Sequence, residues 1–437
     1  MSSFPHARKN MPLTTLATLA ALVAILLTGC GGSTSSGPVT LTVWSWVTNL
    51  KDEAKLFEQA YPNIKVNVVN AGQGAAQYTK LQTALKAGSG APDVVQIEYP
   101  YLPEFELTNK LVDLTKYGAG AVQSQFVPWT WSQVSSGGKV FAIPQDSGPM
   151  GLVYRNDIFS QYHLTVPTTW DQFASTATAL HQANPKAYLT EFSTNDANWF
   201  FSLLWQAGSH PFAVSGTNVT LHLDDAAALK VADYWGGLIK SGAIQAAPDF
   251  NNDWYTALSN GMYASWPTAA WGPGFLTSVA QSTSGKWQAA ELPQWTAGAH
   301  VSSNWGGSTD AVTTYSQHPK EATEFAIWLN SNTTSVLKLN SEQSLFPTVS
   351  AVLNDPTFSA ATDQFFGGQQ VNKAFSQYST TVDTSFQWGP FTDFVYQTWQ
   401  TDFGKAISGA MSYEAAMHQL QSDVVAYAKA QGFTVSS

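Results

Sequence analysis

The sequence of 437 residues contains a single cysteine, Cys30. A lone cysteine cannot form a disulfide within the chain, and it cannot supply a metal site built only from cysteines. Charged residues are also scarce, at 11% against the roughly 25% usual for globular proteins. Disordered chains normally combine high charge with few aromatic residues. Because aromatic residues make up 13% of this chain, the composition predicts a folded protein.

Several catalytic and cofactor-binding motifs are absent from the sequence. The eight histidines are scattered without HExxH spacing, and neither a GxSxG elbow nor a GxxxxGKS/T phosphate loop occurs. Gly72 and Gly74 begin like a dinucleotide-binding loop, but Gln77 takes the place of the third glycine. The stretch from Asp249 begins like a calcium loop, but Trp254 replaces its turn glycine. The sequence therefore predicts no catalytic residues, no cofactor and no metal.

The residues around the cysteine indicate export. Two basic residues come first, followed by the apolar run LATLAALVAILL, which ends at Leu27. A basic start, a short apolar stretch and small residues are typical of a secretory signal peptide, and twelve residues fall short of the ~20 that span a bilayer. The segment LTGC resembles the lipobox of bacterial lipoproteins, in which the cysteine is lipidated. We expect a lipoprotein signal peptide at 1–29, lipid attachment at Cys30 and a flexible tether at 30–38. An ordinary signal peptide with an incidental cysteine is the alternative.

The net charge bears on possible partners. It is −10 for the whole sequence, and loss of residues 1–29 makes it more negative, because they contain two basic residues and no acidic one. A negative chain is a poor partner for nucleic acids and for anionic lipid surfaces. The roughly 400 residues that remain suggest two or three domain-sized units.

Strand and helix patterns alternate along the first part of the chain. Alternation of this kind is typical of βαβ units and a parallel sheet. The expected strands are Val39–Trp46, Ile64–Val69 and 91–98, with helices at 49–62 and 75–88. After residue 150 the pattern is more helical, with helices expected at 166–185, 195–208, 224–242 and 319–331, strands at 286–293 and 310–315, and a helical tail to about Ala430. Thr168 with Asp171 predicts the start of one helix, and Pro319 lies in the first turn of another.

Several stretches together resemble the bacterial extracellular solute-binding protein family 1, the sugar-binding lipoproteins of ABC importers that include maltose-binding protein. They are LTVWSW, KLQTALKAGSGAPDVVQIE, KVFAIPQDSGPMGLVYRNDIF, NGMYASWPTAAW, WQAAELPQW and NWGGSTDAV. The resemblance implies an α/β, two-lobed periplasmic-binding-protein-like fold, each lobe a mostly parallel sheet flanked by helices, with the ligand cleft at the hinge. It implies a first lobe of residues 39–145 plus 293–330 and a second lobe of 146–292 plus 331–437, with crossings near Pro144–Gly148, near Leu292–Gln294 and after about Asn330.

A sugar-binding cleft needs aromatic rings for the apolar faces of the sugar and polar groups for its hydroxyls. By resemblance, Trp271 falls on the main stacking tryptophan of the family, ten residues after Gly261. The aromatic candidates are Trp46, Trp199, Trp271, Trp305 and Trp388. The polar candidates are Glu98, Tyr99, Gln145, Asp146, Asp196, Asn304 and Gly306. For a tryptophan the alternative is core packing, and for the polar residues it is a surface or capping role. Within helical patterns we expect core tryptophans at Trp205, Trp235, Trp328 and Trp399.

The function implied by the resemblance is that of a receptor. It captures a sugar or oligosaccharide outside the cytoplasmic membrane and delivers it to the permease subunits of an ABC transporter. The expected protein is a monomer that is anchored to the outer face of the membrane by its lipid. A secreted glycoside hydrolase is the first alternative, since such an enzyme also needs aromatics and a pair of carboxylates. A receptor for another polar solute is the second. Sequence departures from maltose-binding protein, at Trp46, Pro100 and Tyr101, prevent transfer of its sugar.

Overall fold

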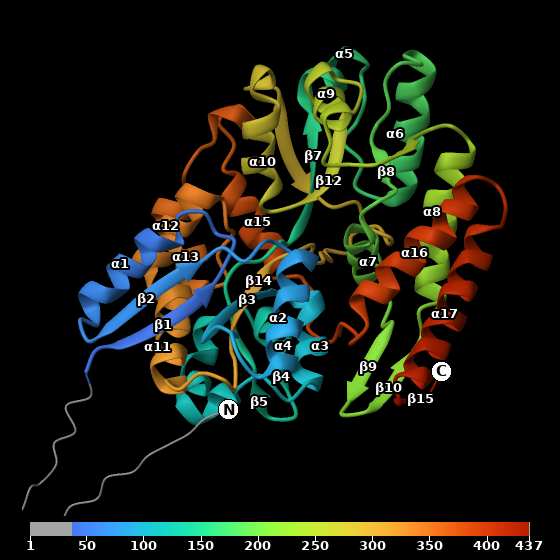
Figure 1. Ribbon diagram of the computed structural model, residues 1–437. Helices are drawn as coiled ribbons and strands as arrows, with labels where there is room; N and C mark the ends of the chain where they lie inside the picture. Colours follow the sequence, from blue (N-terminus) through green and yellow to red (C-terminus); the bar gives the residue numbers. More distant parts are fainter. Residues whose placement is uncertain (1–36, 437) are drawn as a thin grey trace, which may run out of the picture. The chain divides into compact units, whose positions relative to one another are not determined.

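The computed structural model describes residues 37–436. The expected signal peptide, Cys30 and most of the expected tether lie outside these residues. From Pro38 onward the chain forms one compact unit, in which two sheets are each flanked by helices (Figure 1). No helix in the described range is both long and apolar enough to cross a membrane.

The first lobe is built on a five-stranded sheet with the order β2-β1-β3-β14-β6. Its strands are β1 (Val39–Trp44), β2 (Ile64–Val69), β3 (Val94–Glu98), β6 (Ala142–Pro144) and β14 (Ser308–Val312). Strand β1 pairs in parallel with β2 and β3, as the βαβ pattern predicts. Strand β14 runs antiparallel between β3 and β6, so that the sheet is mixed.

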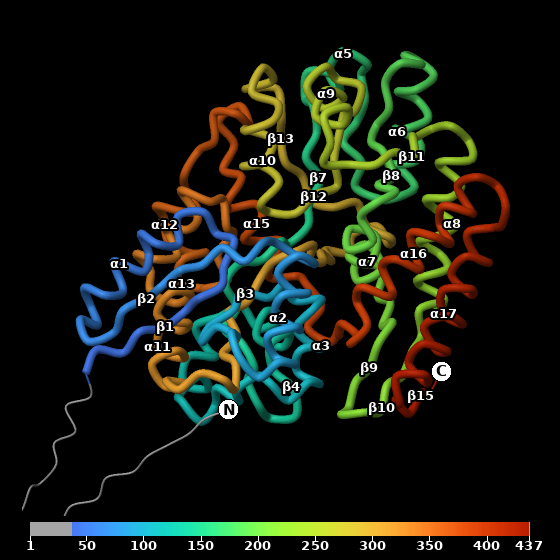
Figure 2. The backbone as a smooth tube through the Cα atoms, viewed as in Figure 1, coloured from blue at the N-terminus to red at the C-terminus, as the bar shows by residue number. Residues whose placement is uncertain are grey.

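Helices and short elements cover this sheet. They are α1 (Leu50–Ala60), α2 (Ala75–Ala87), η1 (Tyr99–Tyr101), α3 (Leu102–Leu107), η2 (Leu114–Tyr117), η3 (Ala119–Gln125), α4 (Pro128–Ser132), β4 (Ser135–Ser136), β5 (Lys139–Val140), α11 (Pro319–Ser331), α12 (Thr333–Gln343) and α13 (Ser350–Leu353). Helices α1 and α11 pack together although they are far apart in sequence, as the blue and orange tubes show (Figure 2). Phe57 of α1 lies 5.1 Å from Phe325 and 5.5 Å from Trp328, ring centre to ring centre. Trp328 was predicted to be a core residue, but it is only half-buried. It packs against Phe57 of α1 and keeps part of its ring exposed.

The second lobe is built on a three-stranded sheet with the order β12-β7-β13. Its strands are β7 (Met150–Arg155), β12 (Ser265–Ala269) and β13 (Trp287–Glu291). Both outer strands run antiparallel to β7, whereas a mostly parallel sheet is expected from the resemblance. Strands β12 and β13 run in the same direction and are joined through helix α10 (Gly272–Val279), as parallel strands require. Strand β7 lies between them in the opposite direction, so each of its pairings is antiparallel. A parallel pair, β8 (Glu191–Ser193) with β11 (Gln245–Ala247), lies beside this sheet.

Most of the second lobe is helical. Its further elements are α5 (Asn156–Gln161), α6 (Trp170–Ala183), α7 (Ala197–Gln206), β9 (Phe212–Ser215), β10 (Asn218–Leu221), α8 (Ala226–Lys240), α9 (Asn252–Asn260), η4 (Gln281–Thr283), α14 (Pro356–Ser359), η5 (Gln364–Phe366), α15 (Val371–Ser379), α16 (Thr392–Ile407), α17 (Tyr413–Ala430) and β15 (Thr434–Ser436). Helix α6 begins at Trp170, and its cap is Thr169, one residue after the predicted Thr168, because Thr169 accepts a hydrogen bond from the backbone of Gln172. Trp205, Trp235 and Trp399 are buried among these helices, as predicted.

The chain crosses between the lobes at three places. The first runs from β6 to β7, where Asp146 bridges Pro347 and Pro149 bridges Asn304. Before the second crossing, the backbone carbonyl of Gln294 accepts a hydrogen bond from the N–H of Trp170 in α6, so Gln294 is still held by the second lobe.

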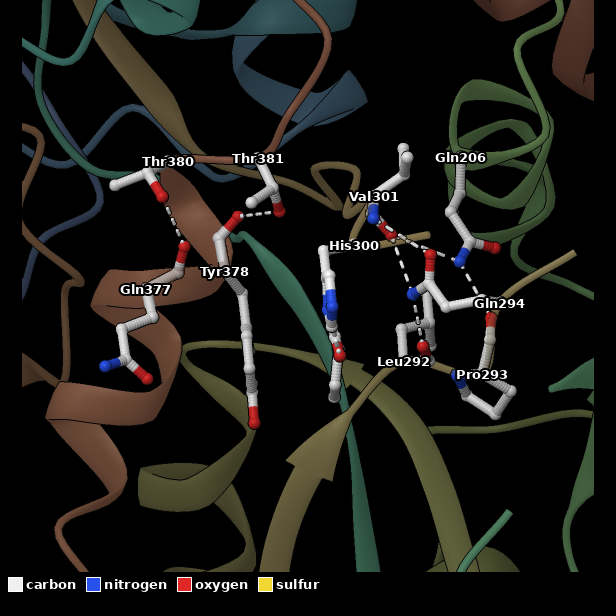
Figure 3. A network of polar contacts seen from close by, with 11 residues as sticks. Gln206, Leu292, Pro293, Gln294, His300, Val301, Gln377, Tyr378, Thr380 and Thr381 are labelled. Carbon is white, nitrogen blue, oxygen red and sulfur yellow. Dashed lines mark hydrogen bonds and ion pairs between the residues drawn. The ribbon is translucent and has the colours of Figure 1, made fainter. Parts of the chain in front are cut away.

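The side chain of Gln294 closes the loop that leads into this second crossing. Its amide donates to the carbonyls of Leu292 and Val301 at 2.6 and 3.0 Å and accepts from the Val301 N–H at 2.8 Å, while Gln206 of α7 donates to the Pro293 carbonyl at 2.8 Å (Figure 3).

The third connection differs from the expectation. Helix α12 packs against α11 of the first lobe, and the N–H of Val127 donates to the carbonyl of Thr348 at 2.9 Å. Helix α15 packs against β7 and β13 of the second lobe. The segment from α12 to α13 is therefore in contact with the first lobe, although the expected boundary follows residue 330.

Candidate ligand-binding cleft

A cleft of about 640 Å³ lies where the two lobes meet. Its walls come from the ends of β1 and β3, the start of α7, the loops before α9 and after β12, the second crossing, and α16. The lining residues are Trp46, Gln73, Gln96, Glu98, Tyr101, Asp146, Asn195, Asp196, Ala197, Asn198, Phe250, Trp271, Phe275, Trp305, Gly306, Gly307, Ser308, Leu345, Tyr396, Gln397 and Gln400. Clefts of this size hold small organic ligands.

One wall carries three neighbouring aromatic side chains, those of Phe250, Trp271 and Trp305. We call this set the indole group after its two tryptophans. The rings of Trp271 and Trp305 are 4.6 Å apart, and Phe250 lies 6.2 Å from Trp271 and 6.1 Å from Trp305. Trp271 Nε1 donates a hydrogen bond to the Trp305 carbonyl at 3.0 Å, which fixes the orientation of its ring. Trp271 is half-buried and Phe250 is 37% exposed, so these two rings present faces to the cleft.

Glycines allow the backbone to approach this group closely. Gly306 has a φ of 75°, and a Cβ there would lie 3.3 Å from Trp271 Nε1. Gly307 has a φ of 86°, and its Cβ would lie 2.8 Å from the Asp146 carbonyl oxygen. Positive φ is strained for residues other than glycine, so the NWGG stretch can pass between the lobes only with glycine at these places.

A second aromatic set, the tyrosine group, consists of Trp46, Tyr101 and Tyr396. Tyr101 lies 6.4 Å from Tyr396, across from α16 of the second lobe. Tyr78 packs against this group, with its ring centre 4.4 Å from that of Tyr101 and 6.4 Å from that of Trp46. Burial raises the pKa of the Tyr101 and Tyr396 hydroxyls, so both remain neutral hydrogen-bonding groups.

Three carboxyl groups line the cleft together with these rings. Tyr78 donates its hydroxyl proton to Glu98 Oε2 at 2.9 Å. Asp146 Oδ1 accepts from the N–H of Ser308 at 2.8 Å. Asp196 Oδ1 accepts from the N–H of Trp199 at 2.8 Å and thereby caps helix α7.

The three carboxyl groups have raised pKa values. Burial raises the pKa of Glu98 to about 7, against the opposing hydrogen bond from Tyr78, and the charge of Asp196 adds to the rise. Burial likewise raises the pKa of Asp146 to about 7, against the opposing hydrogen bond from Ser308. The pKa of Asp196 rises to about 6 through burial, opposed by the N–H of Trp199. Desolvation disfavours the charged form of a carboxyl group, which accounts for all three directions.

Amide side chains complete the lining. Gln96 of β3 accepts hydrogen bonds at Oε1 from the Ser45 hydroxyl at 2.6 Å and from the Trp46 N–H at 3.2 Å. Gln73, Asn195, Asn198, Gln397 and Gln400 also line the cleft. Within residues 37–436, no three His, Cys, Asp or Glu side chains are grouped so as to hold a metal ion.

Seven of the twelve ligand-binding residues predicted from the sequence line the cleft together. They are Trp46, Glu98, Asp146, Asp196, Trp271, Trp305 and Gly306. Asn304 lies behind the crossing, where its Oδ1 accepts from the Gly148 N–H at 2.7 Å and its Nδ2 donates to the Gly306 carbonyl at 2.8 Å. It therefore positions the glycine loop.

The other four predicted residues lie away from the lining. Trp199 is buried in the second lobe, where Nε1 donates to the Pro267 carbonyl at 3.0 Å. Tyr99 is buried against Trp129, and Gln145 donates to Asp310 at 3.0 Å. Trp388 lines a separate hollow of about 440 Å³. Their contact with a ligand stays a prediction.

Phe250, Tyr396 and Gln96 line the cleft but were not candidates in the sequence. Phe250 has a φ of 52°, which is uncommon for a bulky residue. The run DFNND around it carries a turn signal that could have indicated a loop, though no feature of the sequence points its ring toward the cleft. Gln96 belongs to the strand VVQIE, where a single amide in an apolar run was a usable signal.

Two α/β lobes, three crossings between them and an aromatic cleft at the crossings define a two-lobed solute-binding protein. The chain belongs to the bacterial extracellular solute-binding protein family, whose sequence model matches residues 44–334.

Individual relatives extend the match over most of the chain. The lactose-binding protein of Rhizobium radiobacter is 27% identical over 396 residues, which cover 86% of this chain and 89% of the relative. The arabinooligosaccharide-binding protein of Halalkalibacterium halodurans is 24% identical, over 89% of this chain and 92% of the relative.

Solved structures give the same result. A binding protein associated with an ABC transporter of B. animalis subsp. lactis, in complex with beta-1,6-galactobiose, is 32% identical, with a TM-score of 0.78 over 91% of this chain and 99% of the other. The galacto-N-biose-/lacto-N-biose I-binding protein of Bifidobacterium longum, in complex with lacto-N-biose, is 26% identical, with a TM-score of 0.80 over 92% and 99% of the two chains.

Proposed function

We propose that this protein is the receptor of an ABC sugar importer, which captures a sugar or short oligosaccharide outside the cytoplasmic membrane and delivers it to the permease subunits. The observation that carries the proposal is the lining of the cleft, where the indole group and the tyrosine group lie together with Glu98, Asp146 and Asp196. Aromatic faces pack against the C–H faces of sugar rings, and carboxylates accept hydrogen bonds from hydroxyl groups. Two aromatic sets suit a ligand with at least two rings.

The relatives support a carbohydrate over another polar solute. Lactose, arabinooligosaccharides, beta-1,6-galactobiose and lacto-N-biose are the ligands named for four of them. These sugars form the first panel for a thermal-shift screen. A ligand at 100 times its Kd should raise the free energy of unfolding by about 2.7 kcal/mol. If none of these sugars, nor maltose or the common monosaccharides, shifts the melting temperature, the sugar proposal is wrong.

Trp271 provides the sharpest test of the site. Trp271→Ala removes a half-buried ring that the Trp305 carbonyl orients, and we expect binding to weaken by about 2 kcal/mol, roughly thirtyfold. Trp295→Ala is the matched control, because Trp295 is also half-buried in the second lobe but packs against Trp170 and Lys230 outside the cleft. Calorimetric titration of both variants with the same sugar distinguishes them. Equal affinity in the two variants would remove Trp271 from the site.

We further propose that the cleft binds its sugar without hydrolysing it. Glycosidases also place carboxyl groups beside the scissile bond, so the residues that line the cleft do not distinguish binding from hydrolysis. The appearance of reaction products does. Each sugar that shifts the melting temperature should be recovered intact after prolonged incubation. Turnover above background that is lost in Glu98→Gln or Asp146→Asn would favour the hydrolase alternative.

The lipid anchor at Cys30 belongs to the same proposal. It is supported by the LTGC segment and by the family, whose members act outside the cell. Cys30→Ala should move the protein from the membrane fraction to the soluble or secreted fraction. A variant that stays in the membrane fraction would show that another segment holds it there. We expect the released receptor to be a monomer by light scattering.

The contacts of the crossings support a revised division into lobes. We propose that the second crossing lies at residues 302–307 and the third after α13. Gln294 is bound to Trp170 of the second lobe, and α12 packs on α11 of the first. Hydrogen exchange with and without sugar would check this, because hinge amides should change at 302–307. Changes confined to 292–294 would instead support the boundary expected from the sequence.

A further inference from the structure

The cleft contains acids without a basic partner. None of its lining residues in the described chain is Lys, Arg or His, whereas three are acidic. The groups that bind these acids are neutral: the Tyr78 hydroxyl on Glu98 and the backbone N–H groups of Ser308 and Trp199 on the two aspartates. The negative charge of the site is therefore not balanced by any lining side chain.

The scarcity of arginine strengthens this observation. Arg155 is the single arginine within residues 37–436, and it lies buried at the end of β7. Its Nε and Nη2 donate to the two carboxylate oxygens of Asp157 at 2.8 and 2.7 Å, and Nη1 donates to the Leu258 carbonyl at 3.3 Å. Arginine is the side chain best suited to bind carboxylate and phosphate groups in two-point contacts. The only one described lies outside the cleft lining and is bound to Asp157.

The free lone pairs in the cleft define what can bind there. Ionised carboxylates accept hydrogen bonds but donate none. Among the described residues, Glu98 Oε1 accepts no hydrogen bond, while Oε2 accepts one from Tyr78. When Glu98 is ionised, as at pH 8, a ligand group placed there must therefore bring a proton, as a hydroxyl or an amino group does. A second carboxylate or a phosphate would bring only acceptors and a like charge into a site of low dielectric constant.

We propose that the cleft selects carbohydrates without acidic groups and rejects uronic acids, sugar phosphates and sugar sulfates, with Glu98, Asp146 and Asp196 as the residues that determine this selection. The inference rests on the proposed function, since it presupposes that the ligand is a carbohydrate. It adds the rejection of acidic carbohydrates, which the uncharged sugars named for the relatives do not by themselves imply. The three side chains come from both lobes and the first crossing, so an acidic ligand meets them as the cleft closes.

The test compares matched ligands by calorimetric titration at pH 8 and low salt. One is whichever of lactose and beta-1,6-galactobiose binds more tightly, and the others are the same disaccharide with C6 of its non-reducing ring oxidised to a carboxylate or esterified with phosphate. We expect the two acidic forms to bind at least a hundredfold more weakly, which corresponds to about 2.8 kcal/mol at 1.4 kcal/mol per tenfold. The difference should shrink as salt is added, because salt screens charge repulsion.

Variants assign the effect to the cleft. Glu98→Gln keeps the shape of the side chain and should reduce the difference between neutral and acidic forms at least tenfold. Asp196→Asn should act in the same direction while retaining a side-chain oxygen to cap α7. Glu106→Gln is the control, because Glu106 lines the separate hollow near Trp388, and it should leave the ratio unchanged. Melting curves confirm that each variant is folded.

Each outcome decides between the two proposals. An acidic form that binds within threefold of the neutral one, or more tightly, overturns charge selection and leaves the sugar receptor standing. A large difference that Glu98→Gln and Asp196→Asn both leave unchanged also overturns it, since the selection would then come from shape. If neither the neutral nor the acidic forms bind and the wider sugar panel fails, the receptor proposal falls and charge selection falls with it.

Discussion

The raised pKa values of Glu98, Asp146 and Asp196 have a consequence for the free protein. A carboxyl group in an unfolded chain titrates near pH 4, whereas these titrate at about 7, 7 and 6. Between these limits the folded protein binds more protons than the unfolded chain. The contribution of these three groups to the free energy of unfolding therefore falls as the pH rises from about 4 to 7. Other buried carboxyl groups with raised pKa values act in the same direction, namely Glu53, Glu191, Asp249 and Asp310.

We predict that the sugar-free protein melts at a higher temperature at pH 5 than at pH 8. Glu98→Gln should reduce this difference and raise the melting temperature at pH 8, because it removes a group whose ionised form is poorly solvated. Asp233→Asn, on the exposed face of α8, is the control and should leave the difference unchanged. Sugar affinity should change in the opposite direction, rising from pH 5 to pH 8, since hydroxyl donors favour ionised carboxylates. A melting temperature that rises with pH in the absence of sugar would contradict this account.

Gly148 is the tightest backbone contact near the site. A Cβ at this position would lie 1.9 Å from the carbonyl oxygen of Trp305, which no side-chain rotation can relieve. Gly148→Ala should therefore displace the Trp305 loop, weaken sugar binding at least tenfold and lower the free energy of unfolding by about 1–3 kcal/mol.

Gly404→Ala is the matched control for that substitution. Gly404 lies exposed within α16, and nothing is within 4 Å of a Cβ there. Alanine should be neutral or stabilising by about 0.5–1 kcal/mol at such a helical site. Urea unfolding and calorimetric titration of both variants measure the contrast, and unchanged sugar binding in Gly148→Ala would show that the Trp305 loop can move without harm.

At the residue scale, seven of the twelve candidates selected from the sequence line the cleft. Trp271 could be selected because, by resemblance, it falls on the main stacking position of the family, ten residues after Gly261. Trp199 could not be separated from it by composition, because its inward direction depends on the turn at which Asp196 caps α7. Phe250 was missed since its orientation arises from an unusual positive φ. Local sequence indicates that a ring is near a loop, whereas the tertiary fold decides which way it faces.

At the scale of elements, the tryptophans of helices α8 and α11 give a stability prediction. Trp235 of α8 is fully buried, with Trp199 at 5.1 Å and Trp170 at 5.6 Å, so Trp235→Ala should cost about 3–5 kcal/mol. Trp328 of α11 is half-buried against Phe57, and Trp328→Ala should cost clearly less. Urea unfolding of the two variants measures both values. A larger loss for Trp328→Ala would mean that its contact with α1 holds the first lobe together.

Most helices and strands could be predicted because their periodicity is local. Strand β2 and helix α11 match the predicted bounds, and the cap of α6 is Thr169, next to the predicted Thr168. The antiparallel placement of β7 and β14 could not be predicted, because a strand's own residues do not record the direction of its neighbours. The same holds for α12, which remains with the first lobe through contacts with α11 that no short stretch of sequence encodes.

At the scale of the whole described chain, ligand should favour a closed arrangement of the lobes. The cleft is lined from both sides, by Glu98 and Tyr101 of the first lobe and by Trp271 and Tyr396 of the second. A sugar that contacts both sides shifts the equilibrium by its difference in affinity for the two states. Small-angle X-ray scattering should show a smaller radius of gyration with saturating sugar. Trp271→Ala at the same sugar concentration should show little decrease, and identical scattering with and without sugar in the parent protein would rule out closure.

The position of strand β14 also determines when the first lobe can be completed. Ser308 of β14 pairs with Glu98 of β3, so the strand between β3 and β6 lies more than 200 residues further along the chain. During synthesis or export, β3 and β6 emerge long before the strand that joins them. Contacts between such distant segments form slowly, because a long loop must close first. The first lobe therefore cannot complete its sheet until residues more than 200 positions beyond β3 are available, because β14 supplies the strand between β3 and β6.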